Sequence, residues 1–497
     1  MCNSCAANGL LALTALCFAS VAVASPIERL WSGDISTAKT EINYQLTDSE
    51  TVAVFARAEA DYSLGKIYLV NIEDERLRSV KRIGFSDERY KDSDPWLSPS
   101  GNELYFISDR PSFVGDVRDD SDDYDLWRAR RSGTHWTAPE HLGSLNSGTG
   151  EFGPELHQGF LYFSSQRNGR YQLFRARQTR SGFADAELLP QPFNGPALNS
   201  DLTLSRGGQV ALWWSTRPGG YGSGDLYVSR RSKEGWTKAQ NLGESVNSPY
   251  LDFTPSLSPN QSTLFFATNR PYPGQDQGAS DVYRIPVVDV PELRAALATA
   301  TLERLTEAFG GVATLSRIKT LSYRLEIDRA MGADEASDVF LNFESESIAE
   351  RVIGDKAYRT AGGAPGASHA DSARQDQQDE DMLASLYNNF LFYLTAEDLE
   401  LKGPEDIRGH SDLVWFRLAA RGQTSPLLGI DPATGRILKV LADGGIVVLE
   451  LDYLRHESGL VWPYQFLVVR GEQAVLEGRF SNLSINAAKP DEHDTAK

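Results

Sequence analysis

The sequence predicts a mainly β protein, in which an N-terminal β-propeller is followed by an α+β domain with a curved antiparallel sheet and covering helices. Two observations predict this architecture. A strand–turn–strand motif ending in Arg occurs five times in the first 270 residues, and after residue 290 the pattern changes to a long amphipathic helix followed by further strands. At 497 residues, 41% of them hydrophobic, the chain is long and apolar enough for more than one core.

The five copies of the motif are similar in length and order. They are YQLTDSETVAVFAR, PWLSPSGNELYFISDR, PELHQGFLYFSSQR, LTLSRGGQVALWWSTR and PSLSPNQSTLFFATNR, which end at Arg57, Arg110, Arg167, Arg217 and Arg270. Each copy predicts two strands around a turn rich in Ser, Gly, Asn or Asp. A third strand follows, as in KIYLVNI at 66–72, and a Trp-containing segment such as EGWTKAQNL at 234–242 supplies a fourth. Four strands repeated about every 50 residues are typical of propeller blades.

The two ends of the repeat region predict how the ring closes. The fifth copy has no fourth strand after residues 281–287, whereas LWSGDIST at 30–37 is similar to NLGESVNS at 241–248. We therefore expect residues 27–37 to complete the last blade. This gives five blades, and a sixth, degenerate blade stays open as an alternative.

The repeat pattern P-x-L-S-x-x-G-x-x-L-Y-F-x-S-x-R, followed by D-L-Y, resembles the repeat of TolB-like periplasmic β-propellers over about residues 27–288. The resemblance implies the propeller fold for residues 26–290. It indicates little about activity, because propellers serve as binding modules, lyases, glycosidases and peptidase lids.

An acidic residue precedes the first strand of each repeat. These residues are Glu41, Asp92, Glu151, Asp201 and Asp252, although the strictly aligned position of the fourth copy is Asn199. The predicted hairpin brings each acid to the same end of the blade as the repeat arginine. Buried acid–arginine pairs inside each blade are the interpretation that five available arginines favour. The alternative is an acidic ring at the propeller mouth that binds a cation or a basic segment of a partner.

The N-terminus is typical of a secretory signal peptide. Residues 9–24 are an apolar run that ends in Ala22-Val23-Ala24, a small-x-small cleavage pattern, although the first 25 residues contain no Lys or Arg. We expect residues 1–25 to be removed and the protein to be periplasmic or secreted.

All three cysteines, Cys2, Cys5 and Cys17, lie in this segment, so the mature chain would have no disulfide framework and no cysteine metal site. Lipidation at Cys17 stays an alternative, although the bulky Leu16 precedes it. No later apolar run is long enough to span a membrane. The net charge of −19 makes nucleic acid an unsuitable partner.

The second half of the sequence begins with a helical segment at 291–311, which we expect to connect the two domains. Strand-like segments follow over 312–487, including 319–328, 338–346, 350–360 and the hairpin at 461–484. They are interrupted by a Gly-, Ala-, Gln- and Asp-rich segment at 361–381 that predicts a mobile loop. The last residues, 488–497, predict a disordered tail.

Residues 382–394 predict a strongly amphipathic helix that includes Leu386 and Phe390. This order of elements, with GIDPATGRI at 429–437 and YLRHESGLVWP at 453–463, resembles the LolA-like and lipoprotein-sorting superfamily over about residues 295–486. The resemblance implies an apolar cavity for a lipid, which the 382–394 helix would cover. The same apolar face also fits an ordinary core.

Catalytic and metal-binding motifs are sparse. There is no G-x-S-x-G elbow and no H-x-x-x-H pair, and in a strand the neighbours His410, Ser411 and Asp412 would point to opposite faces. Six aspartates between Asp116 and Asp125 leave a Ca²⁺ site open, but they lack the central Gly of an EF-hand loop. We expect no other cofactor.

Two functions fit these observations. The first is an exported binding or scaffold protein whose propeller docks a protein or an envelope component and whose C-terminal domain holds an apolar ligand. The alternative is a polysaccharide-active lyase or glycosidase, which would need carboxylates that meet in the propeller channel.

Overall fold

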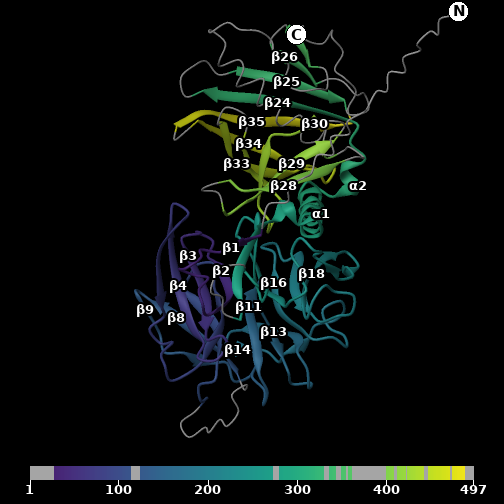
Figure 1. Ribbon diagram of the computed structural model, residues 1–497. Helices are drawn as coiled ribbons and strands as arrows, with labels where there is room; N and C mark the ends of the chain where they lie inside the picture. The colour runs from purple at the N-terminus through teal and green to yellow at the C-terminus, as the bar shows by residue number, and fades with distance from the viewer. Residues whose placement is uncertain are drawn as a thin grey trace, which may run out of the picture.

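The computed structural model describes residues 27–112, 124–272, 279–329, 335–342, 349–353, 356–360, 394, 399–407, 411–420, 423–441, 446–470 and 473–486. Several predicted segments lie outside these residues. They are the expected signal peptide, most of the Asp116–Asp125 loop, the 361–381 segment, the 382–394 helix apart from Leu394, and the 488–497 tail. Figure 1 shows a propeller with a second, sheet-based domain at one end of it and a helix at the junction.

Five antiparallel sheets form the propeller. The first contains β2 (Thr40–Leu46), β3 (Val52–Ala58), β4 (Lys66–Glu73) and β5 (Arg76–Arg82). The second contains β6 (Asp92–Leu97), β7 (Glu103–Ser108), β8 (Asp125–Ser132), β9 (His135–Trp136) and β10 (Glu140–His141). The third contains β11 (Glu151–His157), β12 (Phe160–Ser165), β13 (Gln172–Thr179), β14 (Gly182–Phe183) and β15 (Glu187–Leu188).

The fourth sheet contains β16 (Asn199–Leu204), β17 (Val210–Ser215), β18 (Asp225–Ser232), β19 (Gly235–Trp236) and β20 (Gln240–Asn241). The fifth contains β21 (Asp252–Leu257), β22 (Thr263–Thr268), β23 (Asp281–Pro286) and the N-terminal strand β1 (Glu28–Arg29). The first strands contact one another in the cyclic order β2, β6, β11, β16 and β21. Residues 27–286 therefore form five blades around a central channel, as the sequence predicts.

Strand β1 closes the ring. It pairs antiparallel with β23, with Glu28 opposite Arg284, and the Arg29 guanidinium lies 2.9 Å from the buried carboxylate of Asp281. This confirms the predicted closure by the N-terminal segment. The paired strand is short, since residues 30–37 turn away after it and Ser36 donates a hydrogen bond to the Val282 carbonyl.

Apolar residues of neighbouring blades pack against each other. Phe106 and Trp127 of the second blade lie in one buried cluster with Val54 and Ile67 of the first, and comparable clusters join the other blades. Consecutive residues of the inner strands, such as β7 and β22, are buried on both faces, because each blade packs between two others.

The C-terminal domain begins with helix α1 (Pro291–Ala308) and the short α2 (Val312–Leu315). A single antiparallel sheet follows, in the spatial order β27-β26-β25-β24-β35-β34-β33-β32-β31-β29-β28, with β30 paired to β29. Its strands are β24 (Thr320–Arg329), β25 (Glu335–Asn342), β26 (Ala349–Ile353), β27 (Lys356–Thr360), β28 (Glu400–Glu405), β29 (Val414–Ala420), β30 (Gln423–Thr424), β31 (Leu427–Ile430), β32 (Ile437–Leu441), β33 (Ile446–Arg455), β34 (Val461–Arg470) and β35 (Gln473–Ile485).

Two details of this sheet differ from the prediction. Residues 350–360, expected as one strand, form the hairpin β26–β27; the sequence Gly354-Asp355 between them consists of turn-forming residues that the surrounding alternation obscured. Strand β28 was not predicted, because it contains Gly403 and Pro404 and these residue types are depleted in strands. It lies at the edge of the sheet, where proline is tolerated.

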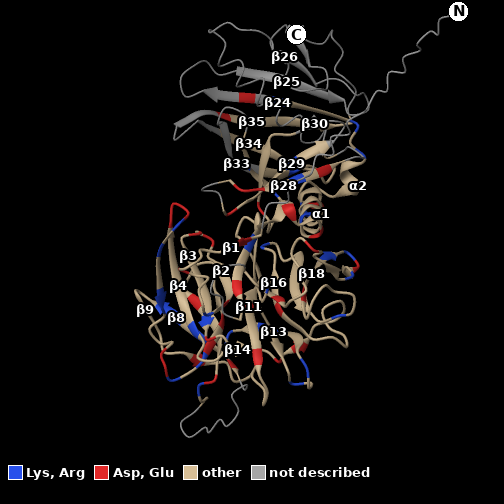
Figure 2. Cartoon of the chain, viewed as in Figure 1, with Lys and Arg blue, Asp and Glu red and all other residues tan. Residues whose placement is uncertain are grey.

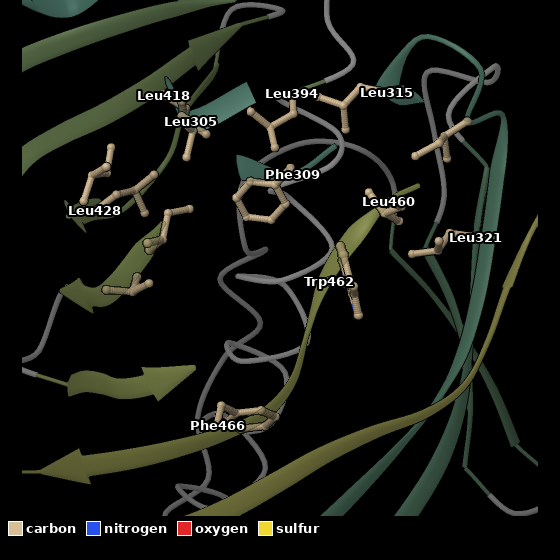
Figure 3. Close-up of a cluster of buried hydrophobic side chains, with 14 of the residues drawn as sticks. Leu305, Phe309, Leu315, Leu321, Leu394, Leu418, Leu428, Leu460, Trp462 and Phe466 are labelled. Atoms are coloured by element: carbon tan, nitrogen blue, oxygen red, sulfur yellow. The ribbon is translucent and has the colours of Figure 1, made fainter. Parts of the chain in front are cut away.

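The C-terminal core lies between α1 and the sheet. Figure 3 shows Leu305 and Phe309 from the end of α1 near Leu428, Leu460 and Trp462 of the sheet region, all of them buried. Residues Gly310 and Gly311 end the helix as predicted. A side chain at Gly310 would place its Cβ 2.5 Å from the Gly459 carbonyl oxygen, so this close approach requires glycine. Among the described residues, no helix is long and apolar enough to cross a membrane.

Candidate functional site

Four of the five predicted acidic residues form buried ion pairs with the repeat arginines. The closest nitrogen–oxygen distances are 2.7 Å for Arg57–Glu41, 2.5 Å for Arg110–Asp92, 3.3 Å for Arg167–Glu151 and 2.8 Å for Arg270–Asp252. All four acids have no exposed side-chain surface. In the fourth blade Arg217 donates to the amide oxygen of Asn199 instead, at 3.1 Å. This arrangement agrees with the predicted acid–arginine pairs in four of the five blades. Because these four carboxylates are fully buried, they are not accessible to a ligand in this structure.

The fifth predicted residue, Asp201, lies in a different place. It lines a cavity of about 440 Å³ in the propeller channel, which we call the chamber. The first strands of all five blades form its wall, and the turns after these strands form its rim together with Ala433 of the C-terminal domain. Figure 2 shows that acidic and basic residues are otherwise interspersed over the propeller.

The inner end of the chamber is a ring of five residues, each two positions after the aligned acid or, in the fourth blade, after Asn199. They are Asn43, Asp94, Gly153, Asp201 and Thr254, with φ angles of 54°, 46°, 55°, 51° and 46°. In every blade the strand register shifts at this point. A bulge of this kind kinks the strand and re-aims its side chains, which explains why non-glycine residues hold a left-handed conformation here.

Hydrogen bonds between blades hold this ring together. The backbone N–H of Gly153 donates to Asp94 Oδ2 at 2.9 Å, and the N–H of Thr254 donates to the Asp201 carboxylate. The N–H of Asn43 donates to Thr254 Oγ1 at 3.4 Å. Each of these side chains thus links its own blade to the next one while also facing the chamber.

The carboxylates of Asp94 and Asp201 lie on either side of Gly153. Asp94 Oδ2 accepts the Gly153 N–H, and a Cβ at Gly153 would lie 2.8 Å from Asp201 Oδ1. Burial, together with the negative charge of Asp94, raises the pKa of Asp201 from 3.8 to about 8. Burial also raises the pKa of Asp94, against the effect of its hydrogen bond from Gly153. Two like charges this close disfavour each other's ionisation, so the pair holds a proton near neutral pH.

A third carboxylate lies further along the wall of the chamber. Glu155 is 8% exposed and accepts the backbone N–H of Leu204 in the next blade at 2.9 Å. Burial raises its pKa to about 7. His157 lies close to the rim, where burial and the nearby Arg304 guanidinium lower its pKa to about 4. The chamber therefore combines three acidic groups that are easily protonated with a neutral imidazole.

The sequence pattern indicated Asp201 but not Asp94 or Glu155. Asp94 lies two residues after the aligned Asp92, and Glu155 lies four residues after the aligned Glu151. These offsets were the available signal, but only the aligned acids were predicted as site residues. Among the described residues, no group of three His, Cys, Asp or Glu is arranged to hold a metal ion. Asp125, the described end of the predicted Ca²⁺ loop, lies 2.8 Å from His141 Nε2. The predicted covering residues Leu386 and Phe390 are outside the described part.

No protein-family model matches this chain, and no curated protein sequence matches it. Solved structures align with it at low identity. The structure of putative TolB from Agrobacterium tumefaciens is 12% identical over 46% of this chain and 70% of its own length, with a TM-score of 0.31. A thermostable family-43 glycoside hydrolase is 11% identical over 50% of this chain and 90% of its own, with a TM-score of 0.33.

The β-propeller domain of the trilobed protease from Pyrococcus furiosus is 10% identical over 88% of this chain and 97% of its own length, with a TM-score of 0.26. At these scores the alignments say nothing about the activity of this chain. The propeller fold rests on the strand pairing described above.

Proposed function

We propose that this is an exported binding protein whose chamber holds a positively charged group of a protein or an envelope component. The observation that carries the proposal is the set of three carboxylates around one cavity, the buried Asp94 and Glu155 and the half-buried Asp201. Within the described residues none of the three forms an ion pair, in contrast to the aligned acids, each of which has its arginine. A bound ammonium or guanidinium group would supply the missing counter-charge.

The raised pKa values give this binding a chemical consequence. Without a ligand, the carboxyl groups retain protons because burial and mutual repulsion disfavour the charged forms. A cationic ligand favours the ionised forms, so its binding releases protons and tightens as pH rises towards 8.

The location and the second ligand are further parts of the proposal. Export to the periplasm or out of the cell is supported by the signal-like residues 9–24.

An apolar or lipid ligand in the C-terminal domain is supported by the resemblance to the LolA-like superfamily and by the apolar face with Leu386 and Phe390. Mass spectrometry of lipids that co-purify with the native protein tests it; an extract without lipid would remove this part of the proposal and leave the domain as a scaffold.

One observation favours a second function, a glycosidase or lyase that acts in the channel. A carboxyl group that keeps its proton near neutral pH is suited to act as a general acid, and Asp201 has a carboxylate neighbour that could take the complementary role. Carboxylates that line one cavity support this alternative.

Photo-crosslinking tests the binding function. A benzophenone amino acid is placed at Gln158, which lies exposed at the rim of the chamber, and for comparison at the exposed Leu188 on the outer strand β15. In an envelope extract we expect a specific adduct from position 158 that disappears in Asp94→Asn and Asp201→Asn. Adducts that are the same from both positions, or that persist in both variants, would contradict the proposal. Release of reducing sugar from envelope polysaccharide, abolished by the same substitutions, would support the enzyme instead.

A further inference from the structure

An ion pair crosses the rim of the chamber. Arg206 Nη2 lies 2.9 Å from Asp48 Oδ2, and both residues line the cavity. Asp48 belongs to the turn after β2 in the first blade, and Arg206 to the turn after β16 in the fourth. The fifth blade lies between these two blades in the ring. The pair therefore does not join neighbouring turns but runs across the mouth.

The C-terminal domain contacts both members of this pair through one residue. Ser411 Oγ donates to the Asp48 carbonyl oxygen at 2.7 Å, and Arg206 Nη1 donates to the Ser411 carbonyl oxygen at 3.4 Å. The side chains of Arg206 and Asp48 are 30% and 41% exposed. Partly exposed ion pairs are weak, because water and salt screen them, so this contact is easily broken.

Other contacts hold the two domains together independently of the pair. Asn260 Nδ2 donates to Asp406 Oδ1 at 2.7 Å. Arg304 of α1 donates to the Gly207 carbonyl at 3.0 Å, and Arg230 of the fourth blade forms an ion pair with Glu303 of α1 at 2.6 Å. Because these bonds involve neither Asp48 nor Arg206, the ion pair can open while the domains stay docked.

We propose that Asp48, Arg206 and Ser411 form a gate over the chamber, in which the ion pair closes the mouth and Ser411 ties the closure to the position of the C-terminal domain. A ligand that displaces the gate would thereby change a contact of the second domain, which couples occupation of the propeller to that domain. The role of the gate in ligand entry rests on the proposed function. The closure itself does not, so it can be tested without any partner.

Thiol labelling provides this test, because residues 18–497 contain no cysteine. Thr203 of β16 lies in the wall of the chamber and is 8% exposed, so Thr203→Cys reports access to the cavity. The rate of its reaction with N-ethylmaleimide is measured alone and combined with Arg206→Ala, Asp48→Asn or Ser411→Ala. Arg175→Ala is the matched control, since it breaks an exposed ion pair with Glu187 on the outside of the third blade.

We expect Arg206→Ala and Asp48→Asn to accelerate labelling about two- to fivefold, Ser411→Ala to accelerate it less, and Arg175→Ala to leave it unchanged. A cysteine at the fully buried Ala267 should stay unreactive in all variants, which shows that the propeller remains folded. If Arg206→Ala exposes that cysteine, the milder Asp48→Asn decides. Equal labelling of Thr203→Cys with and without Asp48→Asn would overturn the gate, and an unchanged rate in Ser411→Ala would overturn its link to the C-terminal domain. Neither result depends on whether the chamber binds a cation.

Discussion

Replacing Asp201 by Asn should make the protein more stable at neutral and alkaline pH. In the folded state burial and Asp94 raise the pKa of Asp201 to about 8, whereas its ordinary value is 3.8. Between these two values the folded state retains a proton that the unfolded state has lost. The free energy of unfolding therefore falls as pH rises from about 4 to about 8.

The size of this effect follows from the shift. One pKa unit corresponds to about 1.4 kcal/mol, so two pH units between pH 5 and 7 correspond to at most about 3 kcal/mol. Because the ionisation of Asp201 is coupled to that of Asp94 and its side chain is only half-buried, we expect about 1–3 kcal/mol. Asparagine at position 201 cannot ionise but keeps an oxygen that can accept the Thr254 N–H. The free energy of unfolding of the variant should therefore lose this dependence on pH.

Urea unfolding at pH 5, 6, 7 and 8 checks the prediction. The nine tryptophans report the transition, and one of them, Trp214, donates a hydrogen bond to Asp201 itself. Wild type and Asp201→Asn should be similar in stability at pH 5 and diverge towards pH 8, with the variant more stable. Asp185→Asn, at an exposed position, is the control for loss of one negative charge. A variant less stable than wild type at pH 8 would refute the reasoning, since Asp201 would then be ionised and paired.

Three further predictions concern the closure of the ring, the arginines inside the blades and Glu50. Deleting residues 27–37 removes β1 and its buried ion pair with the fifth blade, so we expect a loss of about 3–5 kcal/mol and aggregation through the exposed strand edges; a truncated protein that melts like the mature one would contradict the closure. Arg110→Ala should destabilise more than Arg217→Ala by about 1–3 kcal/mol, because it leaves a buried carboxylate unpaired instead of a neutral amide; equal losses in thermal melts would argue against charge pairing in the blades. Burial and the nearby Asp406 raise the pKa of Glu50 to about 7, so ionisation of Glu50 lowers the free energy of unfolding as pH rises from 4.5 to 7. Glu50→Gln should remove this loss and be more stable than wild type by on the order of 1 kcal/mol at pH 8. Unfolding curves with an unchanged pH dependence would show that the pKa of Glu50 is not raised.

The propeller could be predicted from the sequence because its signals are local and repeated. The alternation around each arginine sets the strands, and the similarity of residues 30–37 to 241–248 predicted the closure. The chamber could not be predicted in the same way. It depends on a bulge that turns Asp94 and Asp201 into the channel. The Asn, Asp and Gly residues at four of the five ring positions suit its left-handed backbone, but the approach of two blades at Gly153 depends on the assembled ring. The gate depends on how the C-terminal domain docks, which joins Asp48 to residues far away in the chain.

Whether the chamber attracts positive charge can be measured directly as one labelling ratio. Thr203 lines the chamber and is 8% exposed, so Thr203→Cys places a reactive thiol beside the carboxylates. Its rates with a trimethylammonium and a sulfonate methanethiosulfonate reagent are each divided by the rate with free cysteine. We expect the cationic reagent to be favoured by about tenfold or more at pH 8, and the preference to fall sharply in Asp94→Asn and Asp201→Asn. Equal normalised rates, or a faster reaction with the sulfonate, would contradict a cation-binding chamber.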